Sequence, residues 1–403
     1  MARRVLHLLS QRPSLPGSGV TLDALVRHGA EAGWEQRALV GAPAGRPVPE
    51  VGGLSPDRVS VVEFGGAALP FPVPGMSDLM PYDSSRFSTM SEEQVSRYEE
   101  AWREAIQRAA SFEPDVVHSH HVWLMSSVIK DVLPKVPVVT HCHATGLRQM
   151  ALCPDLAERV RAGCRRNDRF AVLHEEHARL LAGGLGVGGE RIVIVGAGYN
   201  EEIFHDRGRE ASPRAALYAG KLARAKGLPW LLDAVESLSE KHPDLVLHVA
   251  GGGDGAEADA LRGRMEAMGR LVTLHGRLDQ RALGALMRRC ALLVLPSLFE
   301  GLPLVLVEAA ACGCPSVATR LTGVEAELAP RLGPWLTMVD PPGLEGPDEP
   351  RAEDLPRFVT DLEAALDRAL EAPPGRLPPR GLEPFTWGAV YRRVEAAWLE
   401  LVG

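Results

Sequence analysis

Short apolar runs alternate along this chain with longer segments in which apolar residues recur at helical spacing. The strand-like runs of the first half are VLHLL, RALVGA, DVVHSHH, PVVTHCH, RFAVLH and RIVIVGAG, and those of the second half are AALYAGKL, LVLHVAGGG, LVTLHG and ALLVLPS. Helical spacing predicts helices near residues 20–32, 229–241, 257–268 and 280–289. Because strands that alternate with helices build parallel sheets covered on both faces, the pattern predicts doubly wound α/β domains.

A length of 403 residues is comfortable for two domains of ~200 residues each. The irregular segment GAGYNEEIFHDRGREASP interrupts the alternation, so we predict a first domain over residues 1–200 and a second over 212–384. The closing residues 385–403 carry apolar positions at helical spacing and predict a terminal helix, which could cap the second domain.

The formal net charge of −8 argues against a nucleic-acid-binding protein and against strong attachment to anionic membranes. No apolar run approaches the ~20 residues of a transmembrane helix, and the opening MARRVLHLLS is interpreted as a first strand and not as a signal peptide. The six cysteines lack the C-x2-C spacing of a zinc site, so we expect reduced thiols in a cytoplasmic protein.

The segment PSLFEGLPLVLVEAAACGCP carries the most informative chemistry. Its glutamates, Glu300 and Glu308, are eight positions apart, on a strand-to-helix loop and about two turns into the following helix. Pro303 is the expected first helical residue, and Gly313 the expected stop. Free amides at the helix N-terminus suit a phosphate between carboxylates that bind hydroxyls, so the segment predicts a sugar-nucleotide site.

Glycines gather at two other strand ends. Residues 16–20, PGSGV, follow the first strand, where Gly19 would let backbone approach a phosphate, although such glycines are often only structural. In LVLHVAGGGDG, Gly251 and Gly252 end a strand where ligands cross open α/β sheets.

Histidines cluster at the ends of two strands in the first half. The set comprises His118, His120, His121, His141 and His143. Such a cluster could bind a metal, but no H-E-x-x-H helix and no nearby carboxylate accompany it, so we favour a site without metal.

These motifs, in this order, resemble those of the family 4 retaining glycosyltransferases. The resemblance rests on the E-x7-E spacing around Gly-Leu-Pro, the segment GKLARAKG at 220–227, the strand with G-x-G-D-G, and HGRL at 275–278. Lys221 replaces the usual arginine of the second motif, and Arg224 could share its role. The usual asparagine and aspartate of an interdomain motif are Ala197 and Asn200 here, which indicates a divergent branch.

The resemblance implies two Rossmann-like domains facing across a cleft, the GT-B architecture, with the C-terminal helix crossing back to the first domain. It implies catalytic roles for Lys226, Lys221, His143 and Glu300. The implied donor-binding residues are Gly19, Gly251, Gly252, Arg277, Leu278, Gly301, Leu302, Pro303, Leu304 and Glu308. For the acceptor we name His120, His141 and Arg148, the last because an arginine suits a carboxylate or phosphate.

The expected reaction moves a sugar from a nucleoside-diphosphate sugar, with a UDP-sugar as the expected donor, to a small soluble acceptor. The family implies front-face substitution with retention of configuration, no metal and no other cofactor, because fixed cations stabilise the departing diphosphate. Two alternatives remain at this point. One is a sugar-nucleotide epimerase of the same architecture, and the other is a non-catalytic nucleotide-sugar-binding partner of another transferase.

Overall fold

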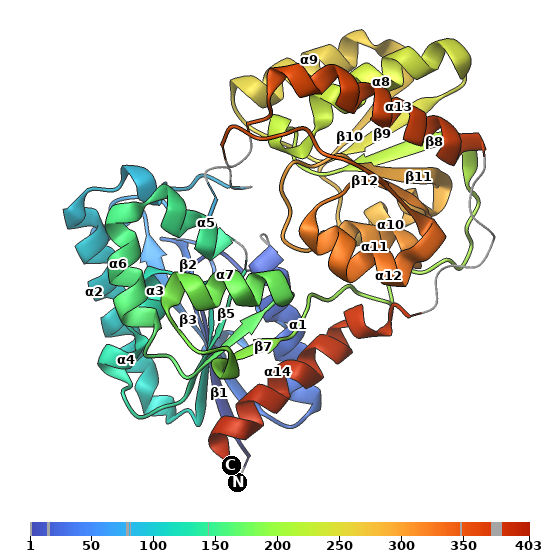
Figure 1. The fold of residues 1–403 in the computed structure, drawn as a ribbon. Coiled ribbons are helices and arrows are strands. Elements are labelled where there is room, and N and C mark those ends of the chain that lie inside the picture. The colour runs from blue at the N-terminus through green and yellow to red at the C-terminus, as the bar shows by residue number, and fades with distance from the viewer. Residues whose placement is uncertain are drawn as a thin grey trace. The chain divides into compact units, whose positions relative to one another are not determined.

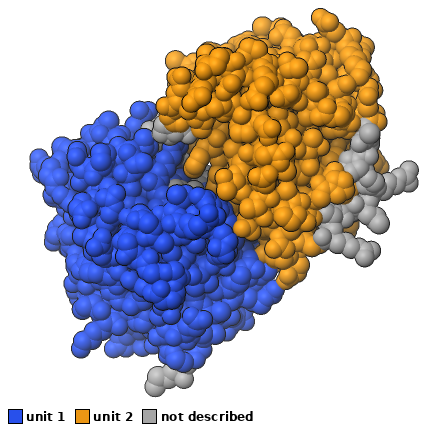
Figure 2. All heavy atoms as spheres, in the orientation of Figure 1, with its two compact units in different colours: residues 1–198, 387–403 blue, residues 199–386 orange. Residues whose placement is uncertain are grey.

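The computed structural model describes residues 2–13, 17–77, 80, 82–143, 145–346, 349–371 and 381–403. The chain forms two compact units, which Figure 2 shows in blue and orange. Unit 1 comprises residues 1–198 together with 387–403, and unit 2 comprises residues 199–386.

Unit 1 is built on a seven-stranded parallel sheet in the order β3-β2-β1-β4-β5-β6-β7 (Figure 1). Its strands are β1 Arg4–Leu9, β2 Glu35–Pro43, β3 Val59–Phe64, β4 Val116–His120, β5 Val138–His141, β6 Arg169–Val172 and β7 Ile192–Ile194. Its helices are α1 Gly17–Glu31, α2 Glu92–Ala109, α3 Leu124–Ser127, α4 Ile129–Val132, α5 Thr145–Leu152, α6 Pro154–Cys164, α7 Glu175–Leu185 and α14 Trp387–Val402.

Unit 2 repeats this construction with a six-stranded parallel sheet in the order β10-β9-β8-β11-β12-β13. Its strands are β8 Ser212–Ala219, β9 Val246–Ala250, β10 Val272–Gly276, β11 Cys290–Leu295, β12 Ser316–Thr319 and β13 Leu336–Val339. Its helices are α8 Leu228–Lys241, α9 Ala256–Ala267, α10 Gln280–Arg289, α11 Leu304–Ala311, α12 Ala329–Leu332 and α13 Leu355–Glu371. The predicted class, two doubly wound α/β domains, is confirmed.

The terminal helix α14 belongs to unit 1, as the family resemblance implied, and it lies beside α1 in Figure 1. Trp398 is fully buried and packs its ring edge-on against Trp34 at a centroid distance of 5.2 Å. The indole nitrogen of Trp34 donates to Glu395 at 2.8 Å. Burial of large aromatic rings with a satisfied N–H is a strong anchor, so α14 is an integral part of the first unit.

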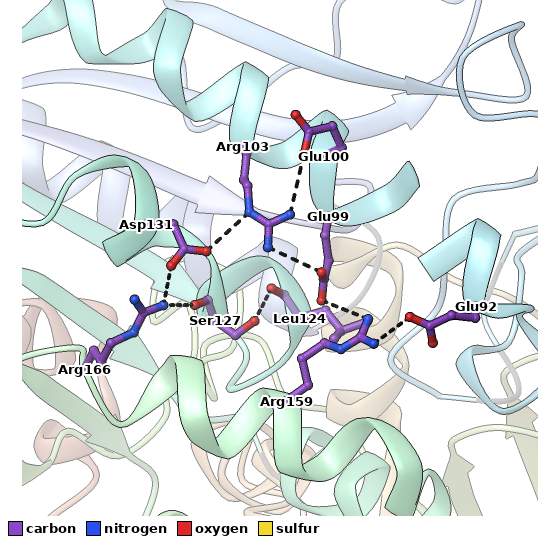
Figure 3. Close-up of polar contacts among 9 residues, drawn as sticks. All are labelled: Glu92, Glu99, Glu100, Arg103, Leu124, Ser127, Asp131, Arg159 and Arg166. Atoms are coloured by element: carbon purple, nitrogen blue, oxygen red, sulfur yellow. Dashed lines mark hydrogen bonds and ion pairs between the residues drawn. The ribbon is translucent and has the colours of Figure 1, made fainter. Parts of the chain in front are cut away.

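A network of ion pairs joins α2 to α4 and α6, and Arg166, which follows α6, also donates to the Ser127 carbonyl of α3, as Figure 3 shows. Glu99 of α2 is buried and lies 3.4 Å from Arg103 and 3.5 Å from Arg159 of α6. Asp131 of α4 pairs with Arg103 at 3.3 Å and with Arg166 at 2.7 Å. A buried carboxylate needs such partners, because an unpaired charge in the interior is costly. The network therefore fixes how these helices pack together.

Two local predictions were wrong in detail. Gly17 and Gly19 were expected before a helix that starts near residue 20, but α1 begins at Gly17, so Gly19 lies in the first helical turn and is buried. Pro303 was expected as the first helical residue, but it is the N-cap, and α11 begins at Leu304. Glu308 comes four residues after Leu304, so it lies little more than one turn into α11 and not two.

Candidate active site

In unit 2, side chains that the sequence predicts to be functional gather at the carboxyl ends of β8 and β11, the central neighbours of the sheet. Chain connections leave in opposite directions from these two strands, and open α/β sheets bind ligands at such a switch point. The loop after β8 carries Lys221 and Lys226, and the loop after β11 carries Glu300. The Leu298 amide donates to the Ala225 carbonyl at 3.0 Å, which holds the two loops together.

The structure brings two of the predicted catalytic residues into direct contact. Lys226 Nζ lies 2.7 Å from Glu300 Oε1, and it also donates to the Phe299 carbonyl at 3.3 Å. The two side chains are only 24% and 17% exposed, so solvent screens this pair less than a surface pair. An ammonium group has three N–H donors, and these two contacts leave one for a further acceptor.

Gly227 shows why the backbone of this loop requires glycine. Its φ is +70°, and a Cβ would come within 1.9 Å of the Pro296 carbonyl oxygen. Any other residue would therefore separate the loops that position Lys226 and Glu300.

The loop after β9 is held between its neighbours by backbone hydrogen bonds. The Gly251 amide donates to the Gly276 carbonyl at 2.8 Å, and the Leu222 amide donates to the Gly252 carbonyl at 3.2 Å. A Cβ on Gly251 would lie 1.7 Å from the Gly220 carbonyl oxygen, so the loops after β8 and β9 approach each other as closely as backbone allows. Three strand-end loops thus form one connected rim.

The other donor-side predictions of unit 2 lie along the same edge, whereas Gly19 lies on α1 of unit 1. Arg277 is exposed and pairs with Asp254 at 3.1 Å, and the adjacent Leu278 is half-buried. The turn Gly301–Leu304 leads into α11 and contains the buried Leu302 and Pro303. Lys221 is exposed, and its carbonyl oxygen accepts from the Tyr218 hydroxyl at 2.5 Å.

Glu308 differs electrostatically from Glu300. Its side chain is half-buried, no cation of the described chain forms an ion pair with it, and burial raises its pKa to about 7. Desolvation disfavours the charged carboxylate, and a ligand that donates hydrogen bonds would favour it again. This carboxyl group is therefore suited to bind hydroxyl groups.

In unit 1, the five histidines of the sequence analysis do form one cluster at the ends of β4 and β5. His120 Nδ1 and His143 Nε2 lie 3.0 Å apart, and the rings of His141 and His143 stack at a centroid distance of 4.5 Å. Burial and then the neighbouring histidines hold the pKa of His120 and of His143 well below 6.5, so both are neutral at pH 7. Only His143 is partly exposed, whereas His118, His120, His121 and His141 are buried.

This burial affects the predicted acceptor residues. His120 and His141 are at most 1% exposed, so their side chains reach a ligand only through His143 or after a rearrangement. Arg148 lies on α5 and is partly exposed. The acceptor role of all three remains a prediction.

The metal alternative can be examined at His118, His120 and His141, which each offer a ring nitrogen within 4.8 Å of the others. Trp398 Nε1 donates to His118 Nδ1 at 2.9 Å. Because an indole can only donate, the neutral His118 ring carries its own proton on Nε2, the nitrogen that a metal would need. Metal-binding histidines show the opposite arrangement, in which the second nitrogen donates, so this trio fits a metal poorly.

Sequence reasoning missed Trp398 and Tyr218. Both are aromatic residues at strand or helix spacing, a pattern that predicts core packing, and only the folded structure reveals the polar contact of each. Glu257 was also missed. Its carboxylate accepts from the Arg224 amide at 2.7 Å and so supports the lysine loop.

All six cysteines are buried and free. Among the helices that the structure describes, none combines the length and apolar character needed to cross a bilayer.

Comparison with known proteins finds two family models along the chain. Residues 16–198 match a glycosyl transferase 4-like domain, and residues 213–337 match the glycosyl transferases group 1 domain. A glycogen synthase of Mycobacterium tuberculosis is 30% identical over 297 residues, which cover 70% of this chain and 67% of that protein. A D-inositol 3-phosphate glycosyltransferase of Catenulispora acidiphila is 30% identical over 62% of this chain and 65% of its own length. Among solved structures, a sucrose-phosphate synthase from Thermosynechococcus elongatus has a TM-score of 0.69 at 18% identity and covers 99% of both chains.

Proposed function

The chain belongs to the GT4-like glycosyltransferases, and from that premise we propose that it transfers a sugar with retention of configuration from a nucleoside-diphosphate sugar to a small soluble acceptor. A UDP-sugar is the expected donor. The observation that carries this proposal is the contact between Lys226 and Glu300, at 2.7 Å, on the rim where β8 and β11 end. It joins a cation suited to a diphosphate with a carboxylate suited to sugar hydroxyls.

In this reaction the bond between the anomeric carbon and the diphosphate oxygen breaks, and the acceptor oxygen bonds to the same face of that carbon. The acceptor proton passes to the departing phosphate oxygen. Lys226 offers its third N–H to that oxygen, while Glu300 orients the ammonium group and keeps its second oxygen for a sugar hydroxyl. A preorganised cation lowers the barrier because it is already oriented when negative charge develops.

The other donor contacts follow from the same rim. Glu308 accepts from the ribose hydroxyls, and the first amides of α11 together with the Gly301–Leu304 turn contact the donor. Gly251 and Gly252 let the diphosphate approach backbone. In unit 1, neutral His143 can donate or accept one hydrogen bond to the sugar.

We further propose that transfer requires no metal ion, because fixed cations supply the charge that an ion would otherwise supply. Turnover should then persist in excess chelator. A complete loss that Zn²⁺ or Mg²⁺ restores would contradict this part of the proposal.

The first test is thermal unfolding with UDP-, GDP-, ADP- and dTDP-sugars, and with the free diphosphates as controls. A ligand that binds only the folded protein raises its Tm by mass action, so one nucleotide class should raise Tm and the others should not. Glu308→Ala should abolish that rise. No rise with any nucleotide would refute the donor assignment. Conversion of the donor in the absence of an acceptor would indicate an epimerase, and binding without any transfer or hydrolysis would indicate a non-catalytic partner.

A further inference from the structure

A cavity of about 930 Å³ lies in unit 1 where β2 and β3 end, away from the histidine cluster along the same sheet. Its wall is mostly apolar and includes five prolines, Phe64, Phe71 and Val48. Three charged side chains also line it, Arg12, Arg46 and Asp83. A volume of several hundred cubic ångströms and an apolar wall with few polar groups are typical of small-molecule sites.

Strand pairing and hydrogen bonds hold the part of the cavity wall that the ends of β2 and β3 and residues 65–72 form. Pro43 and Phe64 are register partners at the last positions of β2 and β3. Beyond them, the Gly65 amide donates to the Phe71 carbonyl at 3.0 Å, and the Ser85 hydroxyl donates to the Pro72 carbonyl at 2.9 Å. Proline fixes φ and has no N–H, so this wall is stiff and its prolines offer no hydrogen-bond donors. An anionic ligand would therefore have to be recognised by the arginines.

The two arginines are available for that task. Arg12 is half-buried, and its guanidinium lies 5.3 Å from the centre of the Tyr82 ring, a contact that orients it. Arg46 is exposed, and within the described part of the chain no carboxylate forms an ion pair with either arginine. Asp83 is the only acidic residue that lines the cavity among the described residues, so the two guanidinium groups leave a net positive charge there.

We propose that this cavity binds a soluble small-molecule acid, with its apolar body against the proline and phenylalanine wall and its phosphate or carboxylate on Arg46 and Arg12. A guanidinium binds either anion through paired N–H donors. Ligands of open α/β sheets lie at the carboxyl ends of the strands, where this cavity is. On the basis of the proposed function, the cavity holds the non-reacting part of the acceptor, which is then an acidic, amphipathic molecule.

The test measures binding of three probes to the full chain by titration calorimetry. The probes are 1-naphthyl phosphate, neutral 1-naphthol and inorganic phosphate. We expect 1-naphthyl phosphate to bind about tenfold or more tightly than either of the others, because only it uses both the wall and the arginines. Arg46→Glu should weaken that probe about tenfold or more, and Arg46→Gln should weaken it less.

Arg27→Gln is the matched control, because Arg27 is an exposed arginine of α1 outside the cavity. It should leave probe binding unchanged. Since Arg46 is exposed and makes no ion pair in the described structure, its variants should keep the wild-type Tm, which separates lost binding from lost folding.

Three results would overturn the inference. One is equal binding of 1-naphthyl phosphate by the wild type and Arg46→Glu, and another is equal affinity for inorganic phosphate and for the naphthyl ester. The third is binding to phosphatidylglycerol vesicles that Arg46→Glu abolishes, without binding of the soluble probe, which would indicate a lipid surface. The donor test is independent: stabilisation by a nucleotide without probe binding refutes the cavity alone, and probe binding without nucleotide stabilisation refutes the transfer reaction alone.

Discussion

Glu308→Gln tests the electrostatic role of the half-buried carboxyl group in unit 2. Burial raises the pKa of Glu308 from 4.5 to about 7, so the folded protein holds this proton over a pH range in which the unfolded chain releases it. The contribution of this group to stability is complete below pH 4.5 and is lost as pH rises through about 7. Glutamine keeps the shape and cannot ionise.

The size of the effect follows from the shift. At 1.36 kcal/mol for each pKa unit, holding the carboxylate charged in the folded protein costs at most ~3 kcal/mol of unfolding free energy. Partial exposure and local relaxation reduce this, so we expect ~1–3 kcal/mol. The wild type should lose that amount relative to Glu308→Gln between about pH 5 and about pH 8.5.

The assay compares the unfolding of both proteins by scanning calorimetry at the two pH values. Taking the difference between the proteins at each pH removes the titration of all other groups. Glu266→Gln replaces an exposed glutamate of the same unit and should show no such difference. An identical pH dependence for Glu308→Gln and the wild type would refute the assigned burial and its consequence.

Donor binding gives a second, functional measure of the same group. If the ribose hydroxyls donate to Glu308, they favour its charged form, so nucleotide binding near pH 6 should release a proton. Calorimetric titration in two buffers of different ionisation enthalpy measures that release. The affinity should rise with pH through about 7 in the wild type and stay level in Glu308→Gln.

Three further substitutions test the loops and the histidine cluster. Lys226→Ala should lower kcat about 10²–10³-fold, the scale of losing one preorganised charge-stabilising group, and steady-state rates that match the wild type would exclude the proposed role. Gly227→Ala should destabilise the protein by more than Gly269→Ala. Both glycines have positive φ, which costs another residue ~1–3 kcal/mol, but only a Cβ on Gly227 would meet a neighbouring carbonyl oxygen. Equal changes in Tm for the two variants would contradict this prediction. His120→Phe keeps an aromatic ring but removes the 3.0 Å hydrogen bond to His143. The kcat should therefore fall about tenfold with little change in the KM for the donor. An unaltered kcat would show that His120 does not position His143.

Much of the architecture could be predicted because residues close together in the sequence determine the alternation of strands and helices. The helix 280–289 was predicted at its observed limits, and the helices near 229–241 and 257–268 begin and end within one residue of the prediction. The errors fell where local signals compete. A glycine near the start of a helix can belong either to the preceding loop or to the first turn of the helix. In α1, both Gly17 and Gly19 belong to the helix.

Contacts between distant segments were not predictable in the same way. Lys226 and Glu300 were each named from motifs, but their 2.7 Å contact depends on β8 and β11 being neighbours, which the sequence does not reveal. The cavity likewise depends on β2 and β3 ending side by side, and none of its charged residues stood out from the sequence. Motifs therefore identify chemistry, whereas strand order decides which groups meet.

The hydrogen bonds of two buried histidines, His7 and His118, fix which ring nitrogen of each carries the proton. Gln36 donates to the Val26 carbonyl at 2.8 Å through its amide nitrogen, so its oxygen accepts from His7 Nε2, at 2.9 Å, and His7 Nδ1 is left as an acceptor. Trp398 fixes the same arrangement at His118, because its indole donates to Nδ1 and the His118 proton therefore stays on Nε2. His7 and His118 are register partners on β1 and β4, and their ring centroids lie 6.0 Å apart in the interior. Protonating His118 at Nδ1 would break its hydrogen bond from Trp398. Burial penalises the charge on either ring and lowers the pKa of both. A residue of α14 thus selects the tautomer of a histidine on β4 that lies 280 residues away along the chain.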